Sequence, residues 1–210
     1  MAKPITHIVL SEKIRDKLFP DKVAKVFLIG TSFPDIRHLK VIEREANHHK
    51  GLSVADLALE SSFQAGLKCH SILDLTRERF MVENGMYDLG PKSDYIVGSV
   101  KFLEDKIFYQ YISDWSQYIK YFDDILEEQK AYNIPEIALR KWHNMLQEYL
   151  ENIPDEGSIT KYILSIGHTQ SVADEINYNI SILEKDKRVL ALIDKLYQEF
   201  ELLLQVKSET

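Results

Sequence analysis

The segment FQAGLKCHSILD, residues 63–74, decides most about how this chain is expected to fold. Its apolar residues recur every three or four positions, which is typical of a helix with a buried face. His70 and Asp74 are four residues apart, so a helix places both side chains on one face. A buried imidazole and a buried carboxylate each need a partner, and a divalent cation suits both. The segment therefore predicts a helix that carries two metal ligands.

Similar patterns along the rest of the chain predict an all-α protein, a multi-helix bundle forming a single domain over residues 1–210. We expect helices over residues 6–19, 53–80, 95–111, 115–130, 135–150 and 171–204. Ser53 is the expected N-cap of the helix that contains His70. Residues 1–80 carry the candidate metal-site motifs, and residues 95–206 supply helical packing elements.

Composition excludes several classes of protein. With 210 residues, 45% of them hydrophobic and 28% charged, the chain is long enough to bury a substantial core. No apolar stretch approaches the roughly 20 residues that a membrane span requires, and no secretory signal is visible. We therefore expect a soluble, cytoplasmic protein. A net charge of −7 argues against extended nucleic-acid binding, and the single cysteine, Cys69, excludes an internal disulfide.

Two further candidate ligands precede the 63–74 segment. Asp35 follows Pro34, and the turn signals around it predict a loop. His49 ends the segment EANHH, in which His48 competes with it for the same role. His38 stands three residues after Asp35 and is a weaker candidate, since a histidine at a polar surface position needs no metal.

Four motifs, taken together in order and spacing, resemble the zinc-dependent phospholipase C family, which is related to the S1/P1 nucleases. The matching stretches are Pro4–His7, Phe27–Asp35, Asn47–His49 and Gly66-x-x-x-His70-x-x-x-Asp74. The resemblance covers about the first 80 residues and implies an all-helical domain of the phospholipase C/P1 nuclease fold.

The same resemblance implies a ligand set. Asp35, His49 and His70 would bind one zinc ion, Asp74 would bridge, and His7 would help to bind a second ion. Its register prefers His49 to His48. It also places the two carboxylates, Asp35 and Asp74, at the reacting centre.

The chemistry of such ligands predicts a function. A mixed nitrogen and carboxylate shell suits zinc or a similar divalent metal, which lowers the pKa of a bound water and polarises a phosphoryl oxygen. We therefore expect a metal-dependent phosphoric-ester hydrolase, a phosphodiesterase or phospholipase C-like enzyme, with one or two ions and a metal-activated water. Its partner would be a phosphoester, lipids included. The long apolar stripe of the last helix would permit a homo-oligomer.

Departures from the family pattern favour a different class of protein. No histidine follows Asp74 closely, and His143 is followed by Gln147 and Glu148 where a His-x-x-x-Glu pair would be needed. The alternative is a catalytically reduced helical binding or scaffold protein, with a structural metal site or none. Two other enzyme classes are excluded by their motifs: no His-Asp dipeptide occurs, and Glu-x-x-His appears only at residues 45–48, which is too few for a di-iron bundle.

Overall fold

The computed structural model describes residues 2–205, and that part of the chain is helical without any strand. This confirms the predicted all-α class. The α-helices are α1 (Pro4–Leu18), α2 (Ala24–Ser32), α3 (Ser62–Glu83), α4 (Ile96–Phe108), α5 (Ser116–Tyr121), α6 (Glu127–Lys130), α7 (Glu136–Leu150), α8 (Glu156–Ser165), α9 (Gln170–Leu183) and α10 (Lys187–Leu203). Short 3-10 helices are η1 (Phe33–Leu39), η2 (Arg44–Ala46), η3 (Val54–Leu57), η4 (Met86–Asp88) and η5 (Tyr109–Tyr111).

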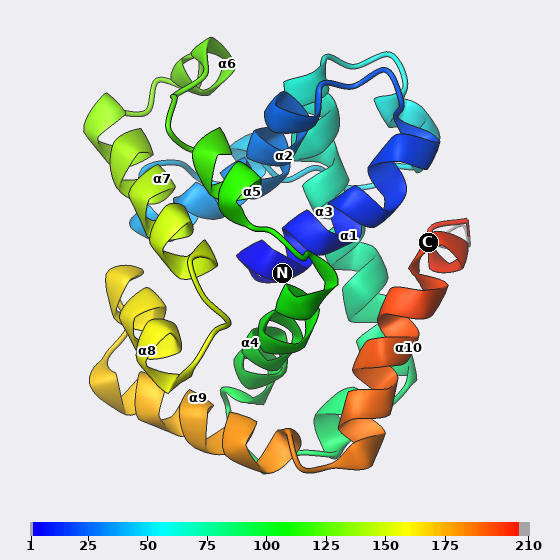
Figure 1. Cartoon of the computed structure of the whole chain (residues 1–210), viewed down its shortest axis with the longest axis vertical. Coiled ribbons are helices and arrows are strands. Elements are labelled where there is room, and N and C mark those ends of the chain that lie inside the picture. The colour runs from blue at the N-terminus through cyan, green and yellow to red at the C-terminus, as the bar shows by residue number, and fades with distance from the viewer. Residues whose placement is uncertain (1, 206–210) are drawn as a thin grey trace.

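Helix α1 lies at the centre of the molecule (Figure 1). It contacts α2, α3, α4 and α10, and every residue from Pro4 to Leu10 is buried. A helix surrounded on all sides needs mostly apolar or small residues all round, and this segment supplies them except at His7. Helices α5 to α7 lie on one side of it, α8 lies below α7 on that same side, α9 runs along the lower edge of the view, and α10 flanks the other side.

Helices α2 and α3 pack against each other with their backbones almost in contact. A Cβ atom on Gly30 would lie 2.3 Å from the carbonyl oxygen of Phe63, and one on Gly66 would lie 1.9 Å from that of Phe27. Only glycine permits this approach. The close crossing brings the end of α2, and η1 after it, next to the helix that carries His70 and Asp74.

Several elements differ from the sequence expectation. The expected helix over 115–130 is two short helices, α5 and α6, with residues 122–126 between them. The helix with His70 begins at Ser62, whose N-cap is Ser61, while Ser53 starts only the short η3 through a capping box with Asp56. The expected helix over 171–204 is two helices, because Asp186 caps a new one. Helix α8 was not predicted; Asp155 begins it by accepting a hydrogen bond from the Ser158 amide at 2.8 Å.

One hydrophobic cluster of buried residues runs from Ile5 in α1 to Phe200 in α10. It therefore joins the motif-bearing first part of the chain with the later helices. None of the helices formed by residues 2–205 combines the length and the apolar character that a membrane span needs. Met1 and residues 206–210, which include the ends of the predicted domain and of its packing segment, lie outside the described residues.

Candidate metal centre

Helix α3 supplies two residues of the candidate centre. His70 is fully buried and Asp74 is 8% exposed, and their Nε2 and Oδ2 atoms are 3.5 Å apart across one helical turn. The Nδ1 atom of His70 lies 2.8 Å from the carbonyl oxygen of Thr31 in α2. A carbonyl can only accept, so Nδ1 carries the proton and the neutral ring presents the lone pair of Nε2. Metal-binding histidines are commonly oriented by such a bond to a backbone carbonyl.

Helix α1 supplies His7, whose ring stacks on that of His70 with centroids 4.0 Å apart. Its Nε2 atom lies 3.3 Å from Oδ1 of Asp74, and the same oxygen accepts a hydrogen bond from the Ala2 amide at 2.5 Å. The start of α1 is fixed by Asp105 of α4. Its carboxylate accepts hydrogen bonds from the amide of Ile5 at 3.3 Å, and from the amide and hydroxyl of Thr6 at 2.7 Å each.

The connection between α2 and α3 supplies Asp35 and His48. Asp35 is 3% exposed and lies in the first turn of η1. The side-chain amide of Asn47 donates to the Pro34 carbonyl at 3.1 Å, so its oxygen is directed at Nδ1 of His48, 2.8 Å away. Because this oxygen accepts, Nδ1 of His48 carries the proton, and Nε2 is the nitrogen that can bind a metal. The ring of His48 meets that of His70 edge-on, with centroids 4.9 Å apart.

These residues form two overlapping groups of possible ligands. His7, His70 and Asp74 make one, and Asp35, His48 and His70 make the other; within each group the ligand atoms all lie within 4.8 Å of one another. Because His70 is common to both, the two groups form one basin of three imidazoles and two carboxylates. Among the described residues, Nε2 of His7, Nε2 of His70 and Oδ1 of Asp35 are buried without a hydrogen bond.

The charges in this basin are unbalanced at neutral pH. Burial lowers the pKa of His70 to about 3 and that of His48 to about 4, so both rings are neutral. Burial would raise the pKa of both aspartates, but the neighbouring histidines outweigh it and bring each pKa below its ordinary value. Two ionised carboxylates and neutral imidazole lone pairs therefore share a buried space, which is the donor chemistry that zinc prefers.

The structure places four of the five predicted metal ligands in this basin and puts His48 where His49 was expected. The amide of His49 donates to the Ser71 hydroxyl at 3.0 Å, and its half-buried ring belongs to neither group of ligands. Burial, together with the charge of Lys68, lowers its pKa. The physical reason is a longer-range contact: Asn47, which donates to the Pro34 carbonyl, orients the ring of His48 and has no contact with that of His49 among the described hydrogen bonds.

Three other histidines have different surroundings. Nε2 of His38 lies 3.5 Å from Oδ1 of Asp35, because residues three apart are eclipsed in a 3-10 helix. His143 is buried between the carbonyl of Phe122 and the side-chain amide of Gln129, at 2.9 Å each, so both of its nitrogens have partners. His168 is exposed in the turn after α8. His38 thus adjoins the basin, whereas His143 is a packing residue.

Basic residues near the basin differ in their surroundings. Arg77 is fully buried and forms an ion pair with Glu104 of α4, so its role is structural. Arg37 follows Asp35 in η1, and its charge helps to lower the pKa of His48. No sequence pattern singled out Lys3, yet its ammonium group lies 4.6 Å from the ring centroid of Phe102 and is acted on by the charge of Asp35 in the basin.

Comparison with family models, with curated proteins and with solved structures found no match to this chain.

Proposed function

We propose that this protein is a metal-dependent phosphoric-ester hydrolase, similar in fold and ligand set to the zinc-dependent phospholipases C. The observation that supports it most is the basin around His70, where buried imidazole nitrogens and carboxylate oxygens converge without enough hydrogen bonds among themselves. Buried polar atoms without partners are uncommon in folded proteins, and a divalent cation would satisfy all of them.

The residues present fit one or two zinc ions. His7, His70 and Asp74 would bind one, and Asp35 and His48, with His70 between the groups, would bind the other. A bound divalent cation supplies a Lewis acid for a phosphoryl oxygen and lowers the pKa of water. The protein itself supplies ionised Asp35 and Asp74, neutral imidazoles fixed in one tautomer, and a largely dehydrated setting. Phosphoester hydrolysis is the reaction class that such a setting suits.

The test is metal analysis of protein purified without chelator, followed by an assay on a soluble phosphodiester such as bis-p-nitrophenyl phosphate with zinc restored. We expect bound metal and turnover in the natural protein, both lost in His70→Ala. His168→Ala is the matched control, since this histidine is exposed and belongs to neither group of candidate ligands. Turnover that persists in folded His70→Ala would refute the proposal.

A structural metal site in a helical binding protein is the second candidate. The observation in its favour is burial, since His7 is 1% exposed and His70 is not exposed at all. Structural zinc sites are closed, whereas catalytic sites keep a position open to water. Stoichiometric zinc that stabilises the fold, without turnover of mono- or diesters, would identify this alternative.

A further inference from the structure

Lys3 has an unusual position for a lysine. It precedes α1 by one residue, and its carbonyl accepts the amide hydrogen bond of His7 at 3.0 Å, so it is fixed one helical turn from the basin. Its ammonium nitrogen lies 4.6 Å from the ring centroid of Phe102 and 5.1 Å from that of Tyr162. Within residues 2–205 this ammonium group has neither a hydrogen bond nor an ion pair with a carboxylate.

The ring contacts do not satisfy such a group. An ammonium ion has three N–H donors and is strongly hydrated in water, whereas aromatic faces offer only a weak electrostatic attraction. The side chain of Lys3 is only partly exposed, and burial lowers its pKa to about 8. A cation is thus placed next to two rings, and its N–H donors are available to a group that residues 2–205 do not provide.

The charges around Lys3 connect it to the Asp35 side of the basin. Asp35 is the carboxylate that acts most strongly on it, followed by Asp105. Asp105 is already occupied by the amides and hydroxyl at the start of α1. Two like charges act on Lys3: Lys101 more strongly, and then Arg37, which lies two residues after Asp35. Lys3 and Arg37 therefore border the half of the basin that contains Asp35.

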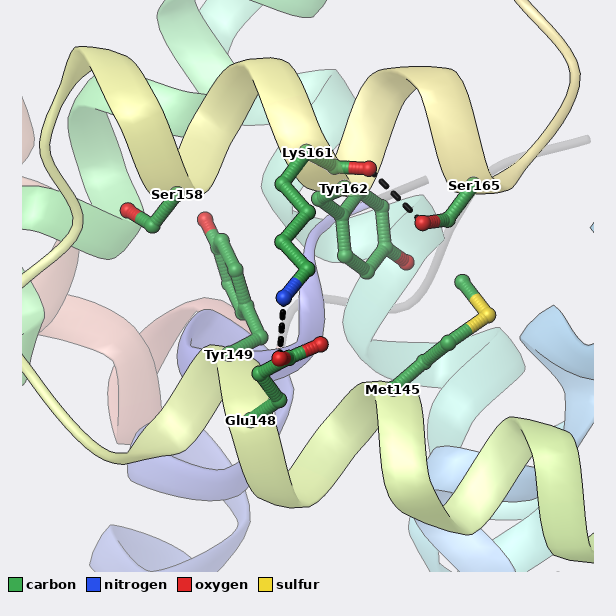
Figure 2. Close-up of a pocket in the computed structure, with 7 residues that line it drawn as sticks. All are labelled: Met145, Glu148, Tyr149, Ser158, Lys161, Tyr162 and Ser165. Carbon is green, nitrogen blue, oxygen red and sulfur yellow. Dashed lines mark hydrogen bonds and ion pairs between the residues drawn. The ribbon is translucent and has the colours of Figure 1, made fainter.

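The aromatic wall under Lys3 is well supported. Tyr162 of α8 packs against Tyr149 of α7 with ring centroids 4.8 Å apart, and against Phe102 at 5.9 Å. Figure 2 shows both tyrosines between α7 and α8, together with the ion pair of Lys161 and Glu148. These residues line a small cavity of about 30 Å³. The rings that position Lys3 are consequently fixed by several elements.

We propose that Lys3 anchors the anionic group of the substrate, its ammonium donating to a nonbridging oxygen of a phosphate mono- or diester bound at the neighbouring basin. This inference rests on the proposed function and names the residue that selects its substrate class. A tetrahedral phosphate has enough oxygens to contact both a metal-binding group and a lysine, and lysine is a frequent point-charge partner of phosphate. Lys3 is here a substrate-binding residue and supplies no metal ligand.

The chain offers a closely matched control. Lys13 lies on the same helix, α1, and its ammonium nitrogen is 4.0 Å from the ring centroid of Tyr197, so it makes the same kind of cation–ring contact. Lys13 belongs to a different surface, lined also by Tyr111 and Tyr118. Substituting it removes one positive charge and one ring contact without touching the basin.

The experiment is calorimetric titration of zinc, and then of inorganic phosphate, into the natural protein, Lys3→Met, Lys3→Arg and Lys13→Met. We expect equal zinc stoichiometry and affinity in all four. Phosphate affinity should fall about tenfold or more in Lys3→Met, stay unchanged in Lys13→Met, and be largely retained in Lys3→Arg. In the diester assay, Lys3→Met should raise KM while zinc content stays constant.

The outcomes separate the two proposals. If the natural protein binds zinc but phosphate binds equally well to it and to Lys3→Met, the assignment of Lys3 is wrong and the metal site stands. If no zinc binds to the natural protein, the hydrolase proposal fails, and the Lys3 assignment fails with it. Should Lys3→Met unfold, Lys3→Gln replaces it, judged by the same titrations. Repeating the assay with phosphatidylcholine vesicles distinguishes a lipid headgroup from a soluble ester, and a loss in Lys3→Met with either supports the assignment.

Discussion

At the scale of single residues, the site depends on which nitrogen of each imidazole carries the proton. Thr31 and Asn47 each accept from an Nδ1 atom, of His70 and His48 respectively, so both rings turn Nε2 toward the basin. Such outer partners fix the tautomer before any metal arrives. They also distinguish residues that the sequence alone treats as equivalent.

The clearest contrast at this scale is between His48 and its neighbour. We expect His48→Ala to weaken zinc binding by about 10–100-fold, because it removes a candidate ligand, and His49→Ala to leave it nearly unchanged. Competition titration against a chromogenic chelator measures both variants. If His49→Ala lowered the zinc affinity more than His48→Ala, His49 would be the ligand, as the family resemblance implies.

A pH dependence follows from His70 in the metal-free protein. Its pKa is about 3 in the folded state and near 6.5 when unfolded, so the unfolded chain binds more protons between these values. Its contribution to stability is therefore complete above pH 6.5 and falls as the pH drops, by up to about 1.4 kcal/mol per unit. Urea unfolding at pH 7 and pH 5 should show a smaller loss for His70→Asn than for the natural protein. Equal losses would contradict this account.

At the scale of elements, the crossing of α2 and α3 brings Asp35 to His70. Gly66→Ala would place a methyl group against the backbone of Phe27, which cannot move as a flexible side chain can. We expect a loss of about 1–3 kcal/mol or more in the free energy of unfolding, together with weaker zinc binding.

Gly98→Ala in α4 is the control for this prediction, because its added Cβ would meet only the Ile176 side chain at 3.7 Å. Alanine is the better helix former, so this variant should keep or slightly gain stability. Thermal melting with and without zinc compares the two. Equal melting temperatures for both variants would show that the close crossing is not what assembles the basin.

Some of these elements and ligands could be predicted from the sequence. Helical periodicity identified the helix with His70, and four-residue spacing placed Asp74 beside it, because these are local properties. Its start was misplaced at Ser53, since Ser61 is an equally good cap and only the packed structure leaves Leu59 fully exposed. The choice between His48 and His49 could not be made locally, because it depends on the bond from Asn47 to the Pro34 carbonyl.

At the scale of the whole molecule, helices α4 and α8 position residues at the start of the chain. Asp105 fixes the start of α1, and Phe102 and Tyr162 position Lys3, although all three lie outside the first 80 residues in which the motifs occur. No sequence pattern marked these residues, because their roles arise from contacts about 100 or more positions apart. The aromatic residues of the second half are mainly packing residues; Trp115 and Phe122 are buried in the core.

A crystal grown with zinc would show whether this basin binds a divalent cation. Anomalous difference maps recorded at the zinc edge would locate the ion without reference to any activity. We expect a peak about 2.0–2.1 Å from Nε2 of His70, with carboxylate oxygens of Asp35 or Asp74 in the same coordination shell. A zinc-soaked crystal without a peak in the basin, from protein whose zinc affinity is unaltered by His70→Ala, would contradict this expectation.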